Sequence, residues 1–256
     1  MIKVRLIPVL LLKSWNLVRS QGFTKHNIIG DPFHEVERFN QWNVDELIYL
    51  IIDKLSDFEI KEKKPINLLK DISKTCFMPL TFGGQIRSIE DIYERFENGA
   101  YKITLNTVAF MKPDFVKEVS NIFGRQAIVA SIDYKTDNHK TNVYVSGGET
   151  STNIDVLDWA LELEKLGAGE ILLQSIDRDG QGKGYDLDLI DKIASKINIP
   201  IIPLGGVGQY EHYVEAIKAG ASAVASANIW HFKEMADYWG KTILKNNNIP
   251  VRLDGI

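Results

Sequence analysis

The sequence predicts an α/β fold of the (β/α)8 TIM-barrel type, built of two similar half-barrels. Eight short apolar runs alternate with amphipathic stretches along the 256 residues, as in βα units arranged around a parallel sheet. The runs are almost continuously apolar, which is expected of strands that are covered on both faces. This length is usual for such a barrel, and no low-complexity linker divides the chain. We therefore expect residues 1–256 to form one domain.

The elements follow one another in regular order. The expected strands are Val4–Leu12, Leu47–Ile52, Met78–Phe82, Lys102–Leu105, Ala127–Ile132, Ile171–Ile176, Ile201–Leu204 and Ala223–Ser226. The expected helices between them include Ile89–Glu97, Pro113–Phe123, Val156–Leu166, Leu187–Lys196 and Tyr210–Lys218. Gly-Ala pairs at Gly99, Gly167 and Gly220 follow three of these helices, and glycine there ends a helix in the left-handed conformation.

Two connections that follow strands are long. Lys13–Asp31 is expected to be a loop, and Tyr134–Asn153 is expected to hold a small hairpin around the alternating segment Asn142–Val145. Long connections at the carboxyl ends of barrel strands are where substrates are handled.

An internal repeat supports the division into halves. Glu46–Asp53 can be laid on Glu170–Asp177, and Pro79–Gly84 on Ile201–Gly206. All βα units resemble one another to some extent. The matched Glu, Asp and glycine pairs occur in the same order, however, which favours a true repeat.

The same register brings out a difference at the first strand of each half. Leu6–Lys13 lies on Ile128–Lys135, so Asp133 falls opposite Leu11. Both positions are expected to face the mouth at the carboxyl ends of the strands. Asp133 is a candidate general acid or base, whereas a leucine transfers no proton. The alternative role for Asp133 is to cap a neighbouring loop.

Two glycine pairs end the third and seventh strands. Glycine there lets backbone N–H groups approach an anion closely. The ends of the next strands are expected to add side-chain donors and the N-terminus of a helix. The pattern favours two phosphate sites, and tight turns without a ligand are the alternative. The candidate residues are Gly83, Gly84, Asn106, Thr107, Gly205, Gly206, Ala227 and Asn228.

Two further groups of polar residues stand at strand ends. Asp179 and Gly180 follow the sixth strand, where Asp179 binds substrate hydroxyls or shapes a turn. At the opposite end of the barrel, two cations and two anions begin four strands and are placed to form a ring of ion pairs. From their position alone, residues at that face serve stability. These four are Arg5, Glu46, Lys102 and Glu170.

Composition narrows the classes of function. The net charge of -4 and the pI of about 5.8 argue against non-specific nucleic-acid binding, and no apolar run is long enough to span a membrane. The start of the chain lacks the features of a signal peptide. The single Cys76 is expected to be a buried inert thiol, and we expect a cytoplasmic protein. The histidines show no ligand spacing, so neither a metal nor a cofactor is expected.

Six segments together resemble the HisF family, the cyclase subunits of imidazole glycerol phosphate synthase. They are Asp45–Leu47, Gly83–Ser88, Gly167–Leu173, Ser175–Gly180, Gly184–Asp186 and Ile249–Leu253. The resemblance implies a substrate with two phosphates and a HisH-like glutaminase docked at the bottom of the barrel. It also implies that ammonia passes through the barrel to the mouth. Arg5, Glu46, Lys102 and Glu170 match the family's gate to that passage, so the resemblance favours a gate over a purely stabilising ring.

The mouth departs from the family pattern. The two catalytic aspartates of the family correspond to Leu11 and Asp133, and only the second is present. Other changes fall on the strand ends and loops. Ile51 replaces an aspartate, Gln174 and Leu204 replace small hydroxyl residues, Asn228 replaces a serine, Arg19 stands for a lysine of the first loop, and Tyr101 replaces an aspartate that faces the glutaminase. The change at Tyr101 favours a different partner.

The segment Pro8–Lys13 resembles a HisF-like branch associated with acetamidino modification of sugars in surface polysaccharides. This resemblance implies that the barrel and its glutaminase supply ammonia to an ATP-dependent sugar amidotransferase. It is our leading hypothesis from the sequence. An authentic cyclase of histidine biosynthesis is the first alternative, and a non-catalytic scaffold that activates a glutaminase is the second.

Overall fold

Eight parallel strands form a closed barrel in the computed structural model, which describes residues 3–42, 44–53, 65–137 and 140–253. They are β1 (Arg5–Lys13), β4 (Leu47–Ile51), β5 (Leu80–Gly83), β6 (Lys102–Leu105), β7 (Ile128–Asp137), β10 (Glu170–Ser175), β11 (Ile201–Leu204) and β12 (Ala223–Ser226). Ladders run from β1 through β4, β5, β6, β7 and β10 to β11, and β12 pairs with β1. Between β11 and β12, the N–H of Ser222 donates to the carbonyl of Ile201. The predicted (β/α)8 barrel is confirmed.

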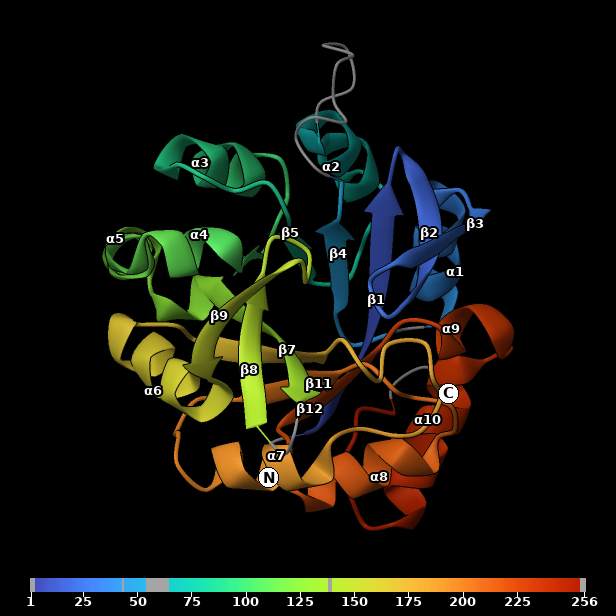
Figure 1. Cartoon of the computed structure of the whole chain (residues 1–256). Coiled ribbons are helices and arrows are strands. Elements are labelled where there is room, and N and C mark those ends of the chain that lie inside the picture. Colours follow the sequence, from blue (N-terminus) through green and yellow to red (C-terminus); the bar gives the residue numbers. More distant parts are fainter. Residues whose placement is uncertain (1–2, 43, 54–64, 138–139, 254–256) are drawn as a thin grey trace.

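Helices surround the strands in chain order (Figure 1). The main ones are α1 (Pro32–Trp42), α2 (Pro65–Ser73), α3 (Ile89–Glu97), α5 (Pro113–Phe123), α6 (Val156–Leu166), α7 (Leu187–Ala194), α8 (Glu211–Lys218) and α10 (Ala236–Asn246). Two short helices, α4 (Thr107–Met111) and α9 (Ile229–Phe232), and the 3₁₀ turn η2 (Arg125–Ala127) complete the described set. Gly99, Gly167 and Gly220 have φ of 102°, 102° and 104°. The predicted left-handed helix ends are therefore confirmed.

Each half-barrel carries a hairpin after its first strand. In the first half it consists of β2 (Asn16–Gln21) and β3 (Lys25–Gly30), and in the second of β8 (Lys140–Val145) and β9 (Thr150–Asp155). The second hairpin was expected, although β7 runs further than expected and pairs with β8. The expectation of a loop over Lys13–Asp31 is wrong. Leu17 and Val18 are buried there, and β2 continues the sheet from β1 in an antiparallel ladder.

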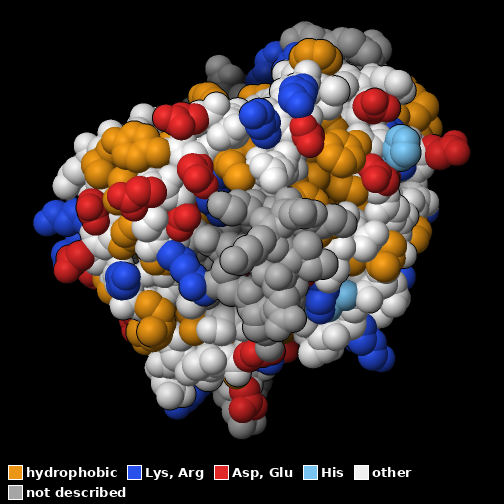
Figure 2. Space-filling model, turned by 90° about the horizontal axis from the view of Figure 1, so that it is seen from above, with side chains coloured by type: hydrophobic (Ala, Val, Ile, Leu, Met, Phe, Trp, Pro, Cys, Tyr) orange, Lys and Arg blue, Asp and Glu red, His pale blue; other side chains and the backbone are white. Residues whose placement is uncertain are grey.

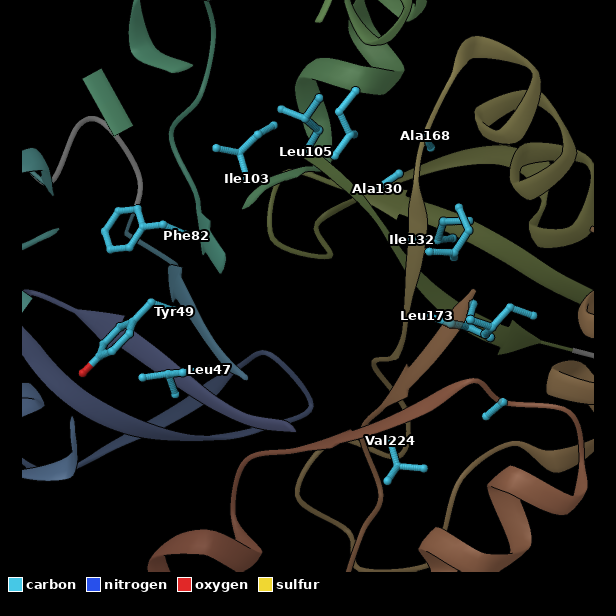
Figure 3. Close-up of a cluster of buried hydrophobic side chains, with 14 of the residues drawn as sticks. Leu47, Tyr49, Phe82, Ile103, Leu105, Ala130, Ile132, Ala168, Leu173 and Val224 are labelled. Carbon is cyan, nitrogen blue, oxygen red and sulfur yellow. The ribbon is translucent and has the colours of Figure 1, made fainter. Parts of the chain in front are cut away.

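The alternation of the strands divides the core into two parts. Side chains that point inward fill the barrel, among them Ile7, Val9, Leu172 and Ile202. Side chains that point outward pack under the helices (Figure 3), where Tyr49 and Phe82 lie stacked with ring centroids 6.3 Å apart. The barrel interior is therefore a packed core.

The surface has a mixed character. In the face shown in Figure 2, acidic and basic side chains are interspersed. None of the helices within the described ranges combines the length and apolar character needed to cross a bilayer.

Candidate active site at the carboxyl ends of the strands

Leu11 and Asp133 occupy equivalent places in the two halves. Leu11 pairs with Val18 of the first hairpin, and Asp133 pairs with Tyr144 of the second. One residue further along, the carbonyls of Leu12 and Tyr134 each accept an N–H from the neighbouring barrel strand, both at 2.9 Å. The aligned register of the two halves therefore holds in three dimensions.

The same repeat fixes the exits of both strands. The N–H of Ser14 donates to Oδ1 of Asp53 at 2.7 Å, and the N–H of Thr136 donates to Oδ2 of Asp177 at 2.8 Å. In each half an aspartate after the second strand thus holds the chain that leaves the first strand. The side chains of these two aspartates therefore stabilise the backbone around the mouth.

Asp133 is a buried carboxyl group at the mouth. The hydroxyl of Ser131 donates to its Oδ1 at 3.1 Å. Burial raises the pKa of Asp133 to about 7, against hydrogen bonds from Ser131 and Asn106 that lower it, and the charge of Asp179 adds to the rise. A carboxyl with this pKa is present in both protonation states near neutral pH, which suits a general acid or base.

In the first half, the position equivalent to Asp133 is apolar. Leu11 is 4% exposed and packs with Val18 and Leu204 in the inner core. The absence of a second carboxylate at this position is therefore accommodated by apolar packing.

A pocket opens between Leu11 and the ends of the last strands. It brings together Leu11 and all four residues predicted for the second phosphate site. Its lining is Val9, Leu11, Gln174, Asp179, Gly180, Leu204, Gly205, Gly206, Val207, Ser226, Ala227 and Asn228.

The glycine turn of this pocket has a fixed conformation. Gly205 and Gly206 have φ of 99° and 100°, which favour glycine. The carbonyl of Gly206 accepts the N–H of Gly184 at 2.7 Å. A Cβ at Gly206 would lie 2.1 Å from the carbonyl oxygen of Gly184. No side chain fits at Gly206, and both glycines line the pocket.

Asp179 fastens the first hairpin over the pocket. Its Oδ2 accepts the hydroxyl of Ser20 at 2.6 Å and the N–H of Phe23 at 3.3 Å. Burial raises the pKa of Asp179, and these hydrogen bonds lower it. Asp179 thus holds the hairpin and also lines the pocket, and its binding of substrate hydroxyls stays a prediction.

Ser20 is a site residue that the sequence reasoning missed. Besides its bond to Asp179, its carbonyl accepts the side-chain amide of Asn228 at 3.4 Å. A Cβ at Gly180 would lie 2.6 Å from the same carbonyl oxygen. The segment Asn16–Ser20 has two adjacent apolar residues followed by two polar ones, so no regular alternation marks Ser20 as an inward-facing residue.

The residues predicted for the first phosphate site also lie together, but their polar groups are partly engaged. Asn106 donates to the carbonyl of Ser131 at 3.1 Å and accepts the hydroxyl of Thr107 at 3.2 Å. The Thr107 oxygen also accepts the N–H of Ser146 at 3.0 Å. Thr107 therefore ties the second hairpin to the barrel.

Arg19 lies away from the pocket. Its guanidinium carbon is 5.2 Å from the ring centroid of Phe232, in a cation–π contact with α9. It is not among the residues that line the pocket.

The four charged residues at the bottom of the barrel close into a ring. Arg5 binds Glu46 at 2.5 Å and Glu170 at 2.8 Å. Lys102 binds Glu46 at 3.2 Å and Glu170 at 2.9 Å. Burial raises the pKa of Glu170, but the charges of Arg5 and Lys102 bring it below the ordinary value. The ring thus consists of four side chains of alternating charge, and four ion pairs join them.

A metal centre finds no support in the described part of the chain. Within those residues, no group of three or more His, Cys, Asp or Glu side chains is placed to hold an ion. Cys76 is half-buried, and burial raises the pKa of its thiol.

Comparisons with known proteins agree with this geometry. The model of the family described as "Histidine biosynthesis protein" matches residues 5–236. The chain is 40% identical to the imidazole glycerol phosphate synthase subunit HisF of Hydrogenobaculum sp. (strain Y04AAS1) over 255 residues, which cover 99% of the chain and all of that protein. It is also 40% identical to the subunit of that name from Endomicrobium trichonymphae, over 98% of the chain and 96% of the relative. The chain therefore belongs to the HisF family.

Proposed function

We propose that the chain is a HisF-type cyclase subunit of an imidazole glycerol phosphate synthase, and so a lyase-type enzyme that works with a HisH-like glutaminase. The observation that carries this proposal is the placement of Asp133. A carboxyl with a pKa of about 7 stands at one end of the barrel interior, and the ring of ion pairs stands at the other. The names of the relatives support the same reaction.

The ring gives the ammonia route its entrance. Arg5, Glu46, Lys102 and Glu170 face the side on which the glutaminase docks, and the inner core lies between them and the mouth. A closed ring excludes water and ions while its members are paired. Ammonia enters when one member swings away, so the ring acts as a gate.

The mouth supplies binding and proton transfer. The backbone at Gly83–Gly84 and Gly205–Gly206 holds the two phosphates of the substrate, which places the reacting carbon between them. Asp133 takes a proton from the attacking nitrogen and returns it to a leaving group. Ser131 and Asn106 keep its carboxyl group in position.

A second candidate function is favoured by Leu11. In this alternative the barrel passes ammonia to an ATP-dependent sugar amidotransferase for acetamidino formation in surface polysaccharide biosynthesis. An apolar residue replaces one of two family aspartates while the ion-pair ring persists. A barrel that conducts ammonia but does not cyclise a substrate needs the ring and does not need the second aspartate.

The rate of cyclisation separates the two candidates. Purified chain is mixed with ammonium salt and the two-phosphate substrate of the histidine pathway, and the products are followed by chromatography. The cyclase proposal expects turnover at an ordinary enzymatic rate in the wild type. It is overturned if the wild type is inactive and Leu11→Asp becomes active.

Leu11→Asn is the matched control because it has nearly the same shape as aspartate and transfers no proton. A gain shared by both variants would therefore come from polarity alone. Replacement of Asp133 separates both enzymes from a mere glutaminase-activating scaffold, which would keep full pathway activity.

A further inference from the structure

A buried arginine lies beneath the first glycine turn. Arg95 of α3 is 5% exposed. One of its terminal nitrogens donates to the carbonyl of Gly84 at 3.1 Å, and the other donates to the carbonyl of Asp91 at 2.7 Å. Its Nε is buried without a hydrogen-bond partner among the described residues. The buried guanidinium therefore bridges a carbonyl of the turn and a carbonyl of its own helix, with the charges of Asp91 and Glu94 nearby.

The bond to Gly84 determines where the next N–H points. In a trans peptide the C=O and the following N–H point in opposite directions. Arg95 of α3 holds the Gly84 oxygen, so the N–H of Gln85 points away from the guanidinium. Gln85 itself has φ of 57°, and its side-chain amide donates to the carbonyl of Asp53 at 3.3 Å. The turn is thus fixed on both sides of this peptide.

In the second glycine turn, too, a hydrogen bond holds the carbonyl of the second glycine, but its donor is neutral. There the carbonyl of Gly206 accepts the backbone N–H of Gly184 at 2.7 Å, and the N–H of Val207 points the opposite way. A hydrogen bond from a charged donor is roughly twice as strong as a neutral one. A guanidinium also contributes an attractive potential to an anion on the far side of the peptide. In both turns the carbonyl of the second glycine is held by a hydrogen bond, from a charged donor at Gly84 and from a neutral one at Gly206.

We propose that Arg95 is a positioning residue for an anion site at the Gly83–Gly84 turn and makes this turn the tighter of the two phosphate sites. The ligand is a phosphate monoester group of the substrate. This inference rests on the two phosphate sites of the proposed function and adds an order of affinity between them. The Gly83–Gly84 turn holds the phosphate that binds first.

Inorganic phosphate is the probe for this order. It is titrated into the full chain labelled with 15N, and the amide signals of Gln85 and Val207 report the two turns separately. In the wild type, Gln85 is expected to saturate at the lower phosphate concentration. Arg95→Met should weaken phosphate binding at Gln85 by about tenfold or more, the loss expected for one charge-assisted hydrogen bond, and leave binding at Val207 unchanged.

Arg95→Lys is the conservative variant. It keeps the charge and loses the forked geometry, so it should bind at Gln85 with an affinity between those of the other two proteins. It also provides the test if Arg95→Met does not fold.

Each result has a distinct meaning. If the wild type binds phosphate at neither turn, the phosphate sites of the proposed function fail and this inference fails with them. If it binds at both and the Arg95 variants leave Gln85 unchanged, the inference alone is overturned. An equal loss at Gln85 and Val207 also overturns it, because general loosening would then explain the effect.

Discussion

At the scale of single residues, the mouth contains one carboxyl whose environment sets its chemistry. Asp133 is enclosed by the barrel and receives hydrogen bonds from Ser131 and Asn106. These bonds do not offset the cost of burying its charge, which keeps the pKa near 7. The equivalent Leu11 lies among apolar neighbours. Of these two equivalent positions, only Asp133 carries a group that can transfer a proton.

Replacement of this carboxyl should affect rate and pH dependence together. Asp133→Asn keeps the shape and most of the hydrogen bonds but cannot exchange a proton. Ammonia-dependent turnover should fall by about 10²- to 10⁴-fold. The wild-type rate should change around pH 7, and the residual rate of the variant should not. A wild-type pH profile that is flat between pH 6 and 8 would contradict the assignment of Asp133.

The same substitution predicts a change in stability. The folded-state pKa of about 7 lies above the unfolded value of 3.8. The contribution of Asp133 to stability is therefore fully present below about pH 4 and is lost as the pH rises through 7. Asp133→Asn should lose less stability between pH 5 and pH 8 than the wild type does. Urea unfolding at the two pH values measures the difference.

Sequence reasoning identified Asp133 because a strand-end aspartate has a recognisable position in the repeat. It did not identify Ser20 or Arg95. Ser20 lies on a strand of its own, which local alternation signals only weakly, and its partners are Asp179 and Asn228, distant in the chain. Arg95 is a charged residue on an amphipathic helix, and nothing in its neighbours shows that it points inward.

At the scale of elements, the glycine turns are the parts with least tolerance. Gly84 has φ of 95°, and a Cβ there would lie 2.2 Å from the carbonyl oxygen of Ile51. Gly147, in the second hairpin, has φ of 69° and nothing within 4 Å of its Cβ position. The two glycines thus share a positive φ, which would strain any other residue, and differ in the space around a Cβ.

Alanine at these two positions should separate the two effects. Gly147→Ala should cost about 1 kcal/mol, the usual penalty of a left-handed non-glycine residue. Gly84→Ala should cost more than about 3 kcal/mol, because strain and a backbone clash act together. Chemical denaturation of both variants measures the difference, and equal losses would show that space at Gly84 is not limiting.

The order of strands and most helix boundaries were predictable because buried parallel strands and amphipathic helices follow separate periodicities. Lys102–Leu105, Ile201–Leu204 and Ala223–Ser226 were predicted to the residue. The first hairpin was missed because its second strand is largely exposed and carries polar residues. Its stability comes from pairing with β2 and from Asp179, which no local pattern reveals.

At the scale of the whole molecule, the ring of ion pairs forms the charged floor of the barrel, and the mouth at the other end is asymmetric because Leu11 stands opposite Asp133. The floor is a closed ring in which each cation binds both anions. Glu46 is 3% exposed and also accepts the hydroxyl of Thr81 at 2.9 Å. The ring is therefore a buried network, and its members depend on one another.

Removal of one cation should destabilise the barrel strongly. Lys102→Met leaves Glu46 and Glu170 facing each other with only Arg5 between them, and should cost about 3 kcal/mol. Lys74→Met is the control, because Lys74 pairs with Asp71 at 2.7 Å on the exposed surface, and should cost less than about 0.5 kcal/mol. Urea unfolding gives both values. Equal costs would show that the ring contributes no more than a surface pair.

The paired fastenings of Ser14 to Asp53 and of Thr136 to Asp177 bear on how such a barrel can evolve. They hold the frame of each half through backbone groups, so the frame does not depend on which side chain faces the mouth at positions 11 and 133. The side chain at position 11 can therefore differ from the one at position 133 without a change in the frame of either half. A lineage of this family can change its chemistry at one inward-facing position and inherit its architecture intact.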